Sequence, residues 1–337
     1  LPDSTGQPMY VWDENEYAGA LEQRLLRTEY DALRRPTRQW LRINSGDEME
    51  IGRTVFGESL KDENGAVPPF VAANNLRGQA LLMLGPEGCN QAVRFDFKGN
   101  LLESRRQLLA DAETHTVDWR SILTDGVTSS HPISSPLLST EVFTQSTQYD
   151  VLNRMTRLEN WHLEGHAPAI YTPTYNRRGA LESETLSVRG QVMQAIRRID
   201  YDAKGQRTRI QYGDPKGDVL TTTRYDYDPH TFRLVQLRTT RHEYEPNPAF
   251  PAFRSNLKDE QVLQQLLYTY DPSGNITEIE DQAYEPVFFK NQQVEPRSRY
   301  EYDAQYQLIS ATGRENYLAN GAPKGFGKVE EMPTQNF

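Results

Sequence analysis

Hydrophobic and polar residues alternate with a period of two on both sides of a short turn near the middle of the chain. Ile199 and Tyr201 precede the turn on one face of an extended strand, and Ile210 and Tyr212 follow it in the same alternation. Such alternation around a glycine-containing connection predicts a β-hairpin. Gly205 supplies the positive φ that a short hairpin loop requires. We therefore expect an antiparallel hairpin here.

A Tyr-Asp signature marks this turn and recurs along most of the chain. Its copies are Tyr30-Asp31, Phe95-Asp96, Tyr149-Asp150, Tyr175-Asn176, Tyr201-Asp202, Tyr225-Asp226, Tyr270-Asp271 and Tyr302-Asp303. The four copies from Tyr149 to Tyr225 are spaced 26, 26 and 24 residues apart. A constant period of this size indicates a structural repeat. Repeat proteins of this kind function through extended surfaces more than through one compact pocket.

We interpret the repeated aspartates as turn-forming residues and not as catalytic groups, because Asp and Asn side chains accept hydrogen bonds from the backbone of a turn. Gly205 and Gly274 complete the clearest copies, and Asn153 takes the glycine position in another. Asn tolerates the left-handed conformation that glycine adopts there. Arg34 and Tyr306 occupy this position in the first and last copies. We expect those two turns to be built differently.

The pattern predicts an all-β fold, a curved strip of antiparallel hairpins with minor helical turns. Residues 1–28 form a lead-in segment, residues 29–316 the array of hairpins, and residues 317–337 an irregular tail. Less regular stretches are Glu14–Arg27 (a short helix or an irregular strand), the loops at 61–75 and 124–139, and the helical candidates Leu108–Glu113 and Asp259–Leu267.

Composition favours a sheet with one semi-polar face over a thick globular core. Only 36% of the 337 residues are hydrophobic, whereas the chain contains 18 tyrosines. Tyrosine and arginine suit broad amphipathic sheets, where rings stack and guanidinium groups lie across them. The net charge of −10 argues against nucleic acid as a partner, since phosphate binding requires concentrated positive charge.

The same composition limits other classes of function. Cys89 is the only cysteine, which excludes an internal disulfide framework and cysteine-based zinc clusters. No apolar run is long enough to span a membrane. The chain has no initiator methionine and no signal-peptide pattern at Leu1, so we expect it to be a piece of a longer protein.

Enzyme signatures are weak throughout, and we expect neither catalysis nor a cofactor. His162 and His166 have a metal-like spacing, but Leu163 follows the first histidine where a zinc protease requires glutamate. The nucleophile-elbow, phosphate-loop and dinucleotide motifs are absent. A glycosidase-like pair of carboxylates stays open as an alternative, because acidic residues are abundant.

The signature resembles that of the RHS/YD-repeat family, whose hairpins carry Tyr-Asp, a turn and a glycine. Tyr201–Gly205 and Tyr270–Gly274 match it best, and the region from Tyr268 to Arg314 is similar to the B and C components of bacterial insecticidal toxin complexes. Asn75–Gly78 and Asp96–Leu102 resemble the same proteins. The resemblance covers roughly residues 29–316 of the chain.

The resemblance implies a role in virulence. In this family the strip of hairpins spirals into a hollow shell that encapsulates a toxic polypeptide until delivery. The expected partners are the remainder of the shell, the enclosed polypeptide and other toxin-complex subunits, and the expected location is secreted. No counterpart of the self-cleaving aspartyl site of such shells is present. The alternative is a β-sheet binding module that recognises carbohydrate or a partner protein, with finished edges and an aromatic groove.

Overall fold

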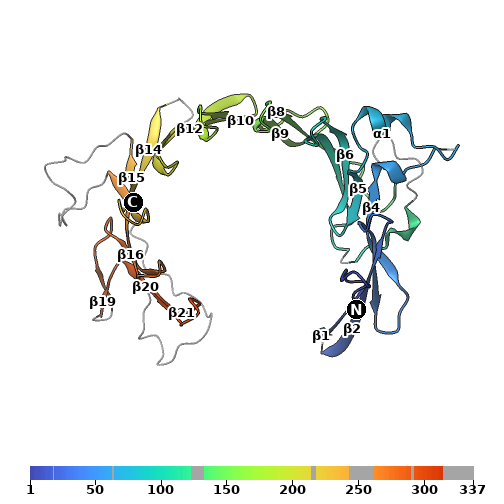
Figure 1. The fold of residues 1–337 in the computed structure, drawn as a ribbon, viewed down its shortest axis with the longest axis horizontal. Helices are drawn as coiled ribbons and strands as arrows, with labels where there is room; N and C mark the ends of the chain where they lie inside the picture. Colours follow the sequence, from blue (N-terminus) through green and yellow to red (C-terminus); the bar gives the residue numbers. More distant parts are fainter. Residues whose placement is uncertain are drawn as a thin grey trace. The chain divides into compact units, whose positions relative to one another are not determined.

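The structure is a computed structural model that describes residues 1–313, apart from 18, 63, 115, 123–132, 214–217, 243–260 and 290–291. The chain forms two compact units, one made of Leu1–Tyr175 with Glu184–Met193 and the other of Asn176–Ser183 with the chain from Gln194 onward. Nearly all regular structure is antiparallel β, and the sheet of each unit is twisted and curved along the strip (Figure 1). The predicted tail at 317–337 lies outside the described residues.

In the first unit each strand pairs with the next one along the chain. The ten strands of this meander are β1 (Tyr10–Tyr17), β2 (Ala20–Tyr30), β3 (Pro36–Ile43), β4 (Met49–Phe56), β5 (Ala80–Gly85), β6 (Gly88–Phe95), β7 (Leu101–Leu108), β8 (Phe143–Tyr149), β9 (Met155–Leu163) and β10 (Ile170–Tyr175). Hairpins thus begin within residues 1–28, and the predicted segment Glu14–Arg27 is strand up to Tyr17 (β1) and again from Ala20 (β2). The helical alternative for that segment is wrong because its residues pair in a regular ladder.

The second unit continues the same topology. Residues of β11 (Leu181–Val188) and β12 (Gln191–Tyr201) belong to both units. From β12 each strand pairs with the next through β13 (Arg207–Gly213), β14 (Val219–Tyr227), β15 (Leu234–Arg241), β16 (Val262–Tyr270), β17 (Ile276–Asp281), β20 (Arg297–Tyr302) and β21 (Leu308–Thr312). Between β17 and β20, β18 (Val287–Phe289) and β19 (Gln292–Val294) form a separate small hairpin.

Two predicted helical segments are strand or turn. Strand β7 extends to Leu108 and a turn follows it. Val262–Leu267 belongs to β16, and the first two residues of that predicted helix, 259–260, lie outside the described residues. Cross-strand pairing outweighs local helix propensity here because each segment continues an existing ladder. The helical structure in the described chain is short, at α1 (Pro69–Ala73), η1 (Gly57–Ser59) and η2 (Trp119–Ser121).

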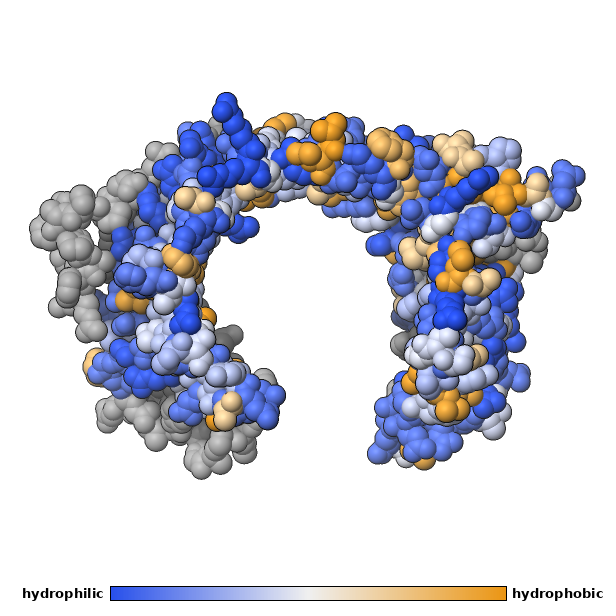
Figure 2. All heavy atoms as spheres, viewed as in Figure 1, coloured by the Kyte–Doolittle hydropathy of each residue, from blue (hydrophilic) through white to orange (hydrophobic). Residues whose placement is uncertain are grey.

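Strand register gives the second unit two different faces. On one face Ile199 lies opposite Ile210, and Tyr225 lies opposite Leu237. On the other face Asp200 lies opposite Arg209. Most side chains on both faces are half-buried. In the view of Figure 2, hydrophobic residues are scattered among hydrophilic ones.

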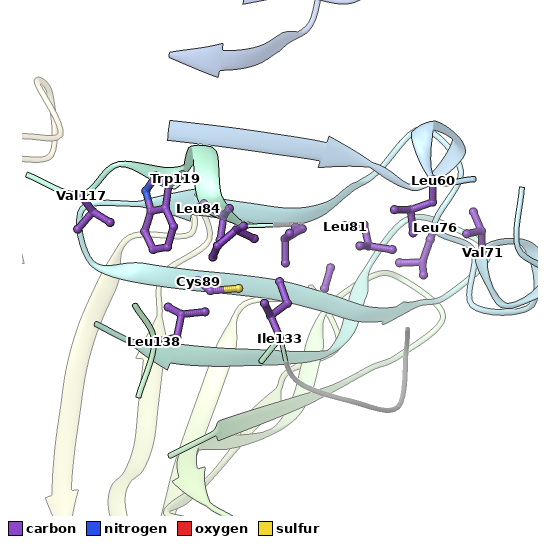
Figure 3. Close-up of a cluster of buried hydrophobic side chains, with 13 residues drawn as sticks. Leu60, Val71, Leu76, Leu81, Leu84, Cys89, Val117, Trp119, Ile133 and Leu138 are labelled. Atoms are coloured by element: carbon purple, nitrogen blue, oxygen red, sulfur yellow. The ribbon is translucent and has the colours of Figure 1, made fainter. Parts of the chain in front are cut away.

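One continuous hydrophobic cluster lies in the first unit, where the segments after β4 and after β7 fold against the sheet (Figure 3). Its thirteen buried residues are Leu60, Val71, Leu76, Leu81, Leu82, Leu84, Cys89, Ala92, Val117, Trp119, Ile122, Ile133 and Leu138. Burial of apolar side chains is the dominant favourable term in folding, so this cluster stabilises its unit.

A buried ion pair fastens the segment after β7 to strand β4. Arg53 donates from Nε and Nη2 to both carboxylate oxygens of Glu50, at 2.7 and 2.6 Å. The same guanidinium donates to the carbonyl oxygens of Trp119 (3.0 Å) and Ile122 (2.7 Å). Glu50 is 1% exposed. A buried ion pair is stable only when the N–H groups that do not contact the carboxylate are also hydrogen-bonded. The carbonyl oxygens of Trp119 and Ile122 accept from those N–H groups of Arg53.

Candidate functional site: a ladder of linked turns

The Tyr-Asp turns of each unit line one edge of its sheet. In a meander every second connection lies at the same edge, and these turns join β2 to β3, β6 to β7 and β8 to β9 in the first unit. In the second unit they join β12 to β13, β14 to β15, β16 to β17 and β20 to β21. This series of turns is referred to below as the turn ladder.

Each turn is closed by hydrogen bonds to its aspartate. The Asp202 N–H donates to the Gln206 carbonyl (2.9 Å), and the Gly205 N–H donates to the Asp202 carbonyl (3.2 Å). The Asp202 carboxylate accepts from the N–H groups of Lys204 (2.8 Å) and Gln206 (2.9 Å). Gly205 has φ 87°. The same four bonds form at Asp31, Asp96, Asp150, Asn176 and Asp303, and Asp271 makes a close variant.

Two further turns of this type were missed in the sequence. Asp3 and Asp62 lack a preceding tyrosine, yet each closes the same four hydrogen bonds with Gly6 and Gly65 in the left-handed position. The signal that identifies them is Asp followed three residues later by Gly. Tyrosine is therefore not required to form the turn.

The turns with Arg34 and Tyr306 do not differ from the others, so that prediction is wrong. Arg34 has φ 63° and Tyr306 φ 62°, close to the 62° of Asn153. A non-glycine residue costs about 1–2 kcal/mol in this conformation. The four hydrogen bonds to Asp31 and Asp303 offset that cost, so the turn geometry tolerates side chains that sequence rules disfavour.

The predicted turn at Tyr225-Asp226 is out of register by two residues. Tyr225 and Asp226 lie inside β14, opposite Leu237 and Gln236. The turn is formed by Asp228, whose N–H donates to the Arg233 carbonyl and whose carbonyl accepts from Phe232. The sequence from Tyr225 to Asp228 contains the Tyr-Asp signal twice. The turn at the second copy, Tyr227-Asp228, is one residue longer than the other turns, so the sequence pattern did not identify it. With Tyr227 in place of Tyr225, the spacing of four copies becomes 26, 26 and 26 residues, from positions 149, 175, 201 and 227.

The tyrosines connect each hairpin to the preceding one, a role that the sequence did not suggest. The Tyr201 hydroxyl donates to the Leu181 carbonyl (2.7 Å), and the Tyr175 hydroxyl donates to the Met155 carbonyl (2.8 Å). Each acceptor lies two residues beyond the left-handed residue of the preceding turn. The same bond joins Tyr30 to Pro8, Tyr227 to Arg207, Tyr270 to Leu234 and Tyr302 to Ile276, at 2.7–3.0 Å.

Polar side chains of neighbouring turns add direct links along the ladder. Arg178 donates to the carbonyls of Asp202 (3.3 Å) and Ala203 (3.2 Å). Gln206 donates to the Phe232 carbonyl (2.8 Å). Others join Arg233 to Asp271, Asn100 to Asn153 and Gln7 to Arg34. The tyrosine bonds and these links fix the spacing of successive hairpins.

Electrostatics follow from the same contacts. The backbone N–H of Arg154 and its guanidinium both donate hydrogen bonds to the Asp150 carboxylate, and they hold the pKa of that carboxyl below its ordinary value. The Asn275 side chain and backbone do the same for the pKa of Asp271. The Arg154 guanidinium also lies 4.7 Å above the Tyr175 ring, within cation–π range. Charged aspartates therefore stabilise the turns.

Other candidate groups do not assemble into a reactive site. In the described part of the chain, no group of three or more His, Cys, Asp or Glu side chains could hold a metal ion. His162 lies in β9 with Nδ1 2.9 Å from the Asn160 carbonyl oxygen, and His166 lies in the following turn. Burial raises the pKa of the Cys89 thiol to about 12. Among the described helices, none has the length and apolar character needed to cross a membrane.

Comparison with known proteins identifies relatives among toxin subunits. The chain matches no model of a known protein family. It is 35% identical over 245 residues to the toxin subunit YenC1 of Yersinia entomophaga, which covers 72% of this chain and 22% of that subunit. It is 32% identical over 242 residues to YenC2 of the same organism, with the same coverage. The chain thus spans about a fifth of the length of these relatives.

Solved structures agree on the fold. The crystal structure of TcdB2-TccC3-Cdc42 superposes with a TM-score of 0.63 at 24% identity, covering 93% of this chain and 13% of that one. The Photorhabdus luminescens Tc holotoxin pore with the TccC3 mutation D651A gives a TM-score of 0.62 at 23% identity, covering 93% and 12%. The chain is accordingly an RHS/YD-repeat protein that resembles the shell-forming B and C components of bacterial insecticidal toxin complexes.

Proposed function

We propose that this chain is a wall segment of an RHS-repeat shell that encapsulates a toxic polypeptide and sequesters it before delivery. The observation that carries the proposal is the turn ladder. Tyrosine hydroxyls and turn side chains fasten successive hairpins along one edge, so the strip keeps a defined spacing where it has no thick core. A wall that separates two compartments requires this property more than it requires a pocket.

The relatives support the same role. YenC1 and YenC2 are toxin subunits, and the chain spans about a fifth of their length. A partial strip leaves strand edges that pair with further hairpins, since an exposed edge is a template for another strand. The hydrophobic cluster and the Glu50–Arg53 pair join the segments after β4 and after β7 to the sheet of the first unit and thicken it.

In this role the chain acts by enclosure and not by catalysis. Its partners are the remainder of the shell, the enclosed polypeptide and other toxin-complex subunits, and it acts as a secreted component. The aspartates of the turn ladder accept hydrogen bonds from the backbone N–H groups of their own turns. Their carboxylates are therefore poorly placed for acid–base chemistry. No cofactor has a part in this mechanism.

Protease protection of the full-length parent protein tests the proposal. The parent, expressed with its downstream region, is treated with a nonspecific protease, and the fragments are mapped by mass spectrometry. We expect the enclosed polypeptide to survive until denaturant opens the shell. A polypeptide digested at the same rate inside the native protein as when free would contradict enclosure.

A further inference from the structure

A Tyr-x-Tyr motif recurs in the strands of the second unit, and its second tyrosine belongs to the turn ladder. The copies are Tyr225-Asp-Tyr227 in β14, Tyr268-Thr-Tyr270 in β16 and Tyr300-Glu-Tyr302 in β20. The two tyrosines of a copy are two residues apart in one strand, so their side chains project from the same face of the sheet. In each copy the second tyrosine donates its hydroxyl to a main-chain carbonyl, that of Arg207, Leu234 or Ile276. The first tyrosine requires a separate explanation.

The hydroxyl of the first tyrosine is free in every copy. Tyr225, Tyr268 and Tyr300 make no hydroxyl hydrogen bond to the residues that the structure describes, and neither does Tyr212 of β13. These four are named the free tyrosines. They are half-buried, but their oxygens are not among the described buried atoms that lack a partner, so each hydroxyl reaches solvent. Burial raises the pKa of Tyr225 and of Tyr268, so both hydroxyls keep their protons and can donate.

Strand register places the free tyrosines on one face, which is named the tyrosine face. Their cross-strand neighbours there are aliphatic or carry a hydroxyl: Thr221 opposite Tyr212, Leu237 opposite Tyr225, Ile279 opposite Tyr268 and Ala311 opposite Tyr300. From β13 to β20, the charged residues that pairing assigns to this face are Arg241 and Asp281, each the last residue of its strand. The middle of the tyrosine face is therefore uncharged.

The opposite face of the same sheet carries the charges. Asp200 lies opposite Arg209, and Glu278 lies opposite Arg299. In the described part of the second unit, strands pack against their sheet neighbours and no second layer covers the tyrosine face. An uncharged face of a sheet ordinarily lies against another layer of the protein. The tyrosine face is thus built for a partner beyond the described strands.

We propose that the tyrosine face binds an extended, unfolded polypeptide, with the free tyrosines donating to its main-chain carbonyl groups. The fold already contains this interaction, because Tyr227, Tyr270 and Tyr302 each donate to the carbonyl of the first residue of a strand. A free tyrosine, two residues earlier in the same strand, can donate in the same way to a chain that lies across the face. Tyrosine also offers a large contact area at a low cost in conformational entropy. A carbonyl is the same group whatever the side chain, so this binding does not depend on sequence.

The width and the charge of the face argue for this occupant. With no charge in its middle, the face selects neither an acidic nor a basic partner. The free tyrosines lie on β13, β14, β16 and β20, and five spacings of about 4.8 Å between adjacent strands separate the first from the last, about 24 Å in all. About seven residues of extended chain cover that width, at about 3.3–3.6 Å per residue. The inference rests on the proposed function for the identity of the occupant, which in the parent protein is the enclosed polypeptide.

The test uses this chain and fluorescein-labelled lactalbumin that is reduced and carboxymethylated and so stays unfolded, with binding followed by fluorescence anisotropy at physiological ionic strength. We expect the wild-type chain to bind this probe and not native, folded lactalbumin. A triple variant with Tyr225→Phe, Tyr268→Phe and Tyr300→Phe removes three hydroxyls and keeps the rings, and it should bind about tenfold more weakly. The matched control is Tyr306→Phe, which removes the same group from a 63% exposed tyrosine in the turn between β20 and β21. Its affinity should stay close to that of the wild type.

A melting curve separates a binding role from a structural one. The triple variant should melt at the temperature of the wild type, because it removes no hydrogen bond between described residues. A lower melting temperature would mean that the hydroxyls support the fold, which would overturn the inference. So would unchanged affinity of the triple variant, an equal loss in Tyr306→Phe, or equal binding of folded and unfolded lactalbumin.

Other occupants give distinct results. Tighter binding of cellohexaose than of the unfolded probe would assign the face to carbohydrate, and self-association that the triple variant abolishes would assign it to a second copy of this chain. Either result would overturn the inference. Protease protection of the parent protein is a separate measurement, so enclosure can fail while the unfolded probe binds, and binding can fail while the enclosed polypeptide stays protected.

Discussion

Removal of a single tyrosine hydroxyl tests whether the turn ladder holds the strip together. Tyr201→Phe deletes the 2.7 Å hydrogen bond to the Leu181 carbonyl and leaves the ring in place. A hydrogen bond of this kind contributes about 0.5–1.5 kcal/mol, and an acceptor left unsatisfied in a part-buried position adds to the loss. We therefore expect the free energy of unfolding of the second unit to fall by about 1–2 kcal/mol.

Urea denaturation followed by tyrosine fluorescence measures this change, since all four tryptophans lie in the first unit, and hydrogen exchange locates it. Amide exchange in the hairpin that contains Leu181 should accelerate. The matched control is Tyr225→Phe, since Tyr225 lies in β14 of the same unit without a hydrogen bond from its hydroxyl to a described residue. Equal effects of the two variants, or none from Tyr201→Phe, would refute the reasoning.

Four other predictions follow from individual contacts. Gly205→Val should lower stability by about 1–2 kcal/mol in urea denaturation, purely through its φ of 87°, because the added Cβ meets no atom within 4 Å; an unchanged midpoint would contradict this. Arg53→Met should destabilise the first unit by about 3 kcal/mol, as measured by urea unfolding, because it leaves the buried Glu50 carboxylate with only the more distant Arg38 guanidinium, 3.5 Å away. The pKa of the Asp150 carboxyl is lower in the folded state than in the unfolded chain. The charged carboxylate therefore stabilises the fold fully above the unfolded-state pKa of about 3.9, and this stabilisation is lost as the pH falls through the folded-state pKa. Asp150→Asn should therefore reduce stability at pH 7 and have little effect near pH 2, as compared by thermal melting. Cys89, which is 2% exposed, should react with a thiol reagent only after unfolding, and rapid labelling of the native chain would contradict its burial.

The hairpin repeat is predictable from sequence because its signals are local. Alternation, an aspartate and a glycine three residues later all act within one turn, and Asp202 with Gly205 shows the complete set. The position of the turn near Tyr225 was not predictable from the Tyr-Asp signal alone, because Tyr225 and Tyr227 are both followed by aspartate. Only pairing with β15 assigns the turn to Asp228.

Features that depend on neighbouring strands were beyond the reach of sequence patterns. The Tyr201 hydroxyl reaches a carbonyl 20 residues earlier, a contact that exists only once two hairpins are adjacent. The alignment of Arg209, Arg224 and Arg238 across β13, β14 and β15 likewise arises from the registers of three strands. The Glu50–Arg53 pair is close in sequence, but its burial depends on Trp119, more than 60 residues away.

The most direct test of the central claim is a cryo-electron microscopy map of the full-length toxin complex that contains this chain. The account predicts that the strands β1 to β17, with β20 and β21, form part of one continuous wall, with further hairpins paired at both ends, around a closed cavity that contains unstructured density. A map in which the strip forms a solid sandwich, or lies on the outside of a complex without an enclosed cavity, would contradict it.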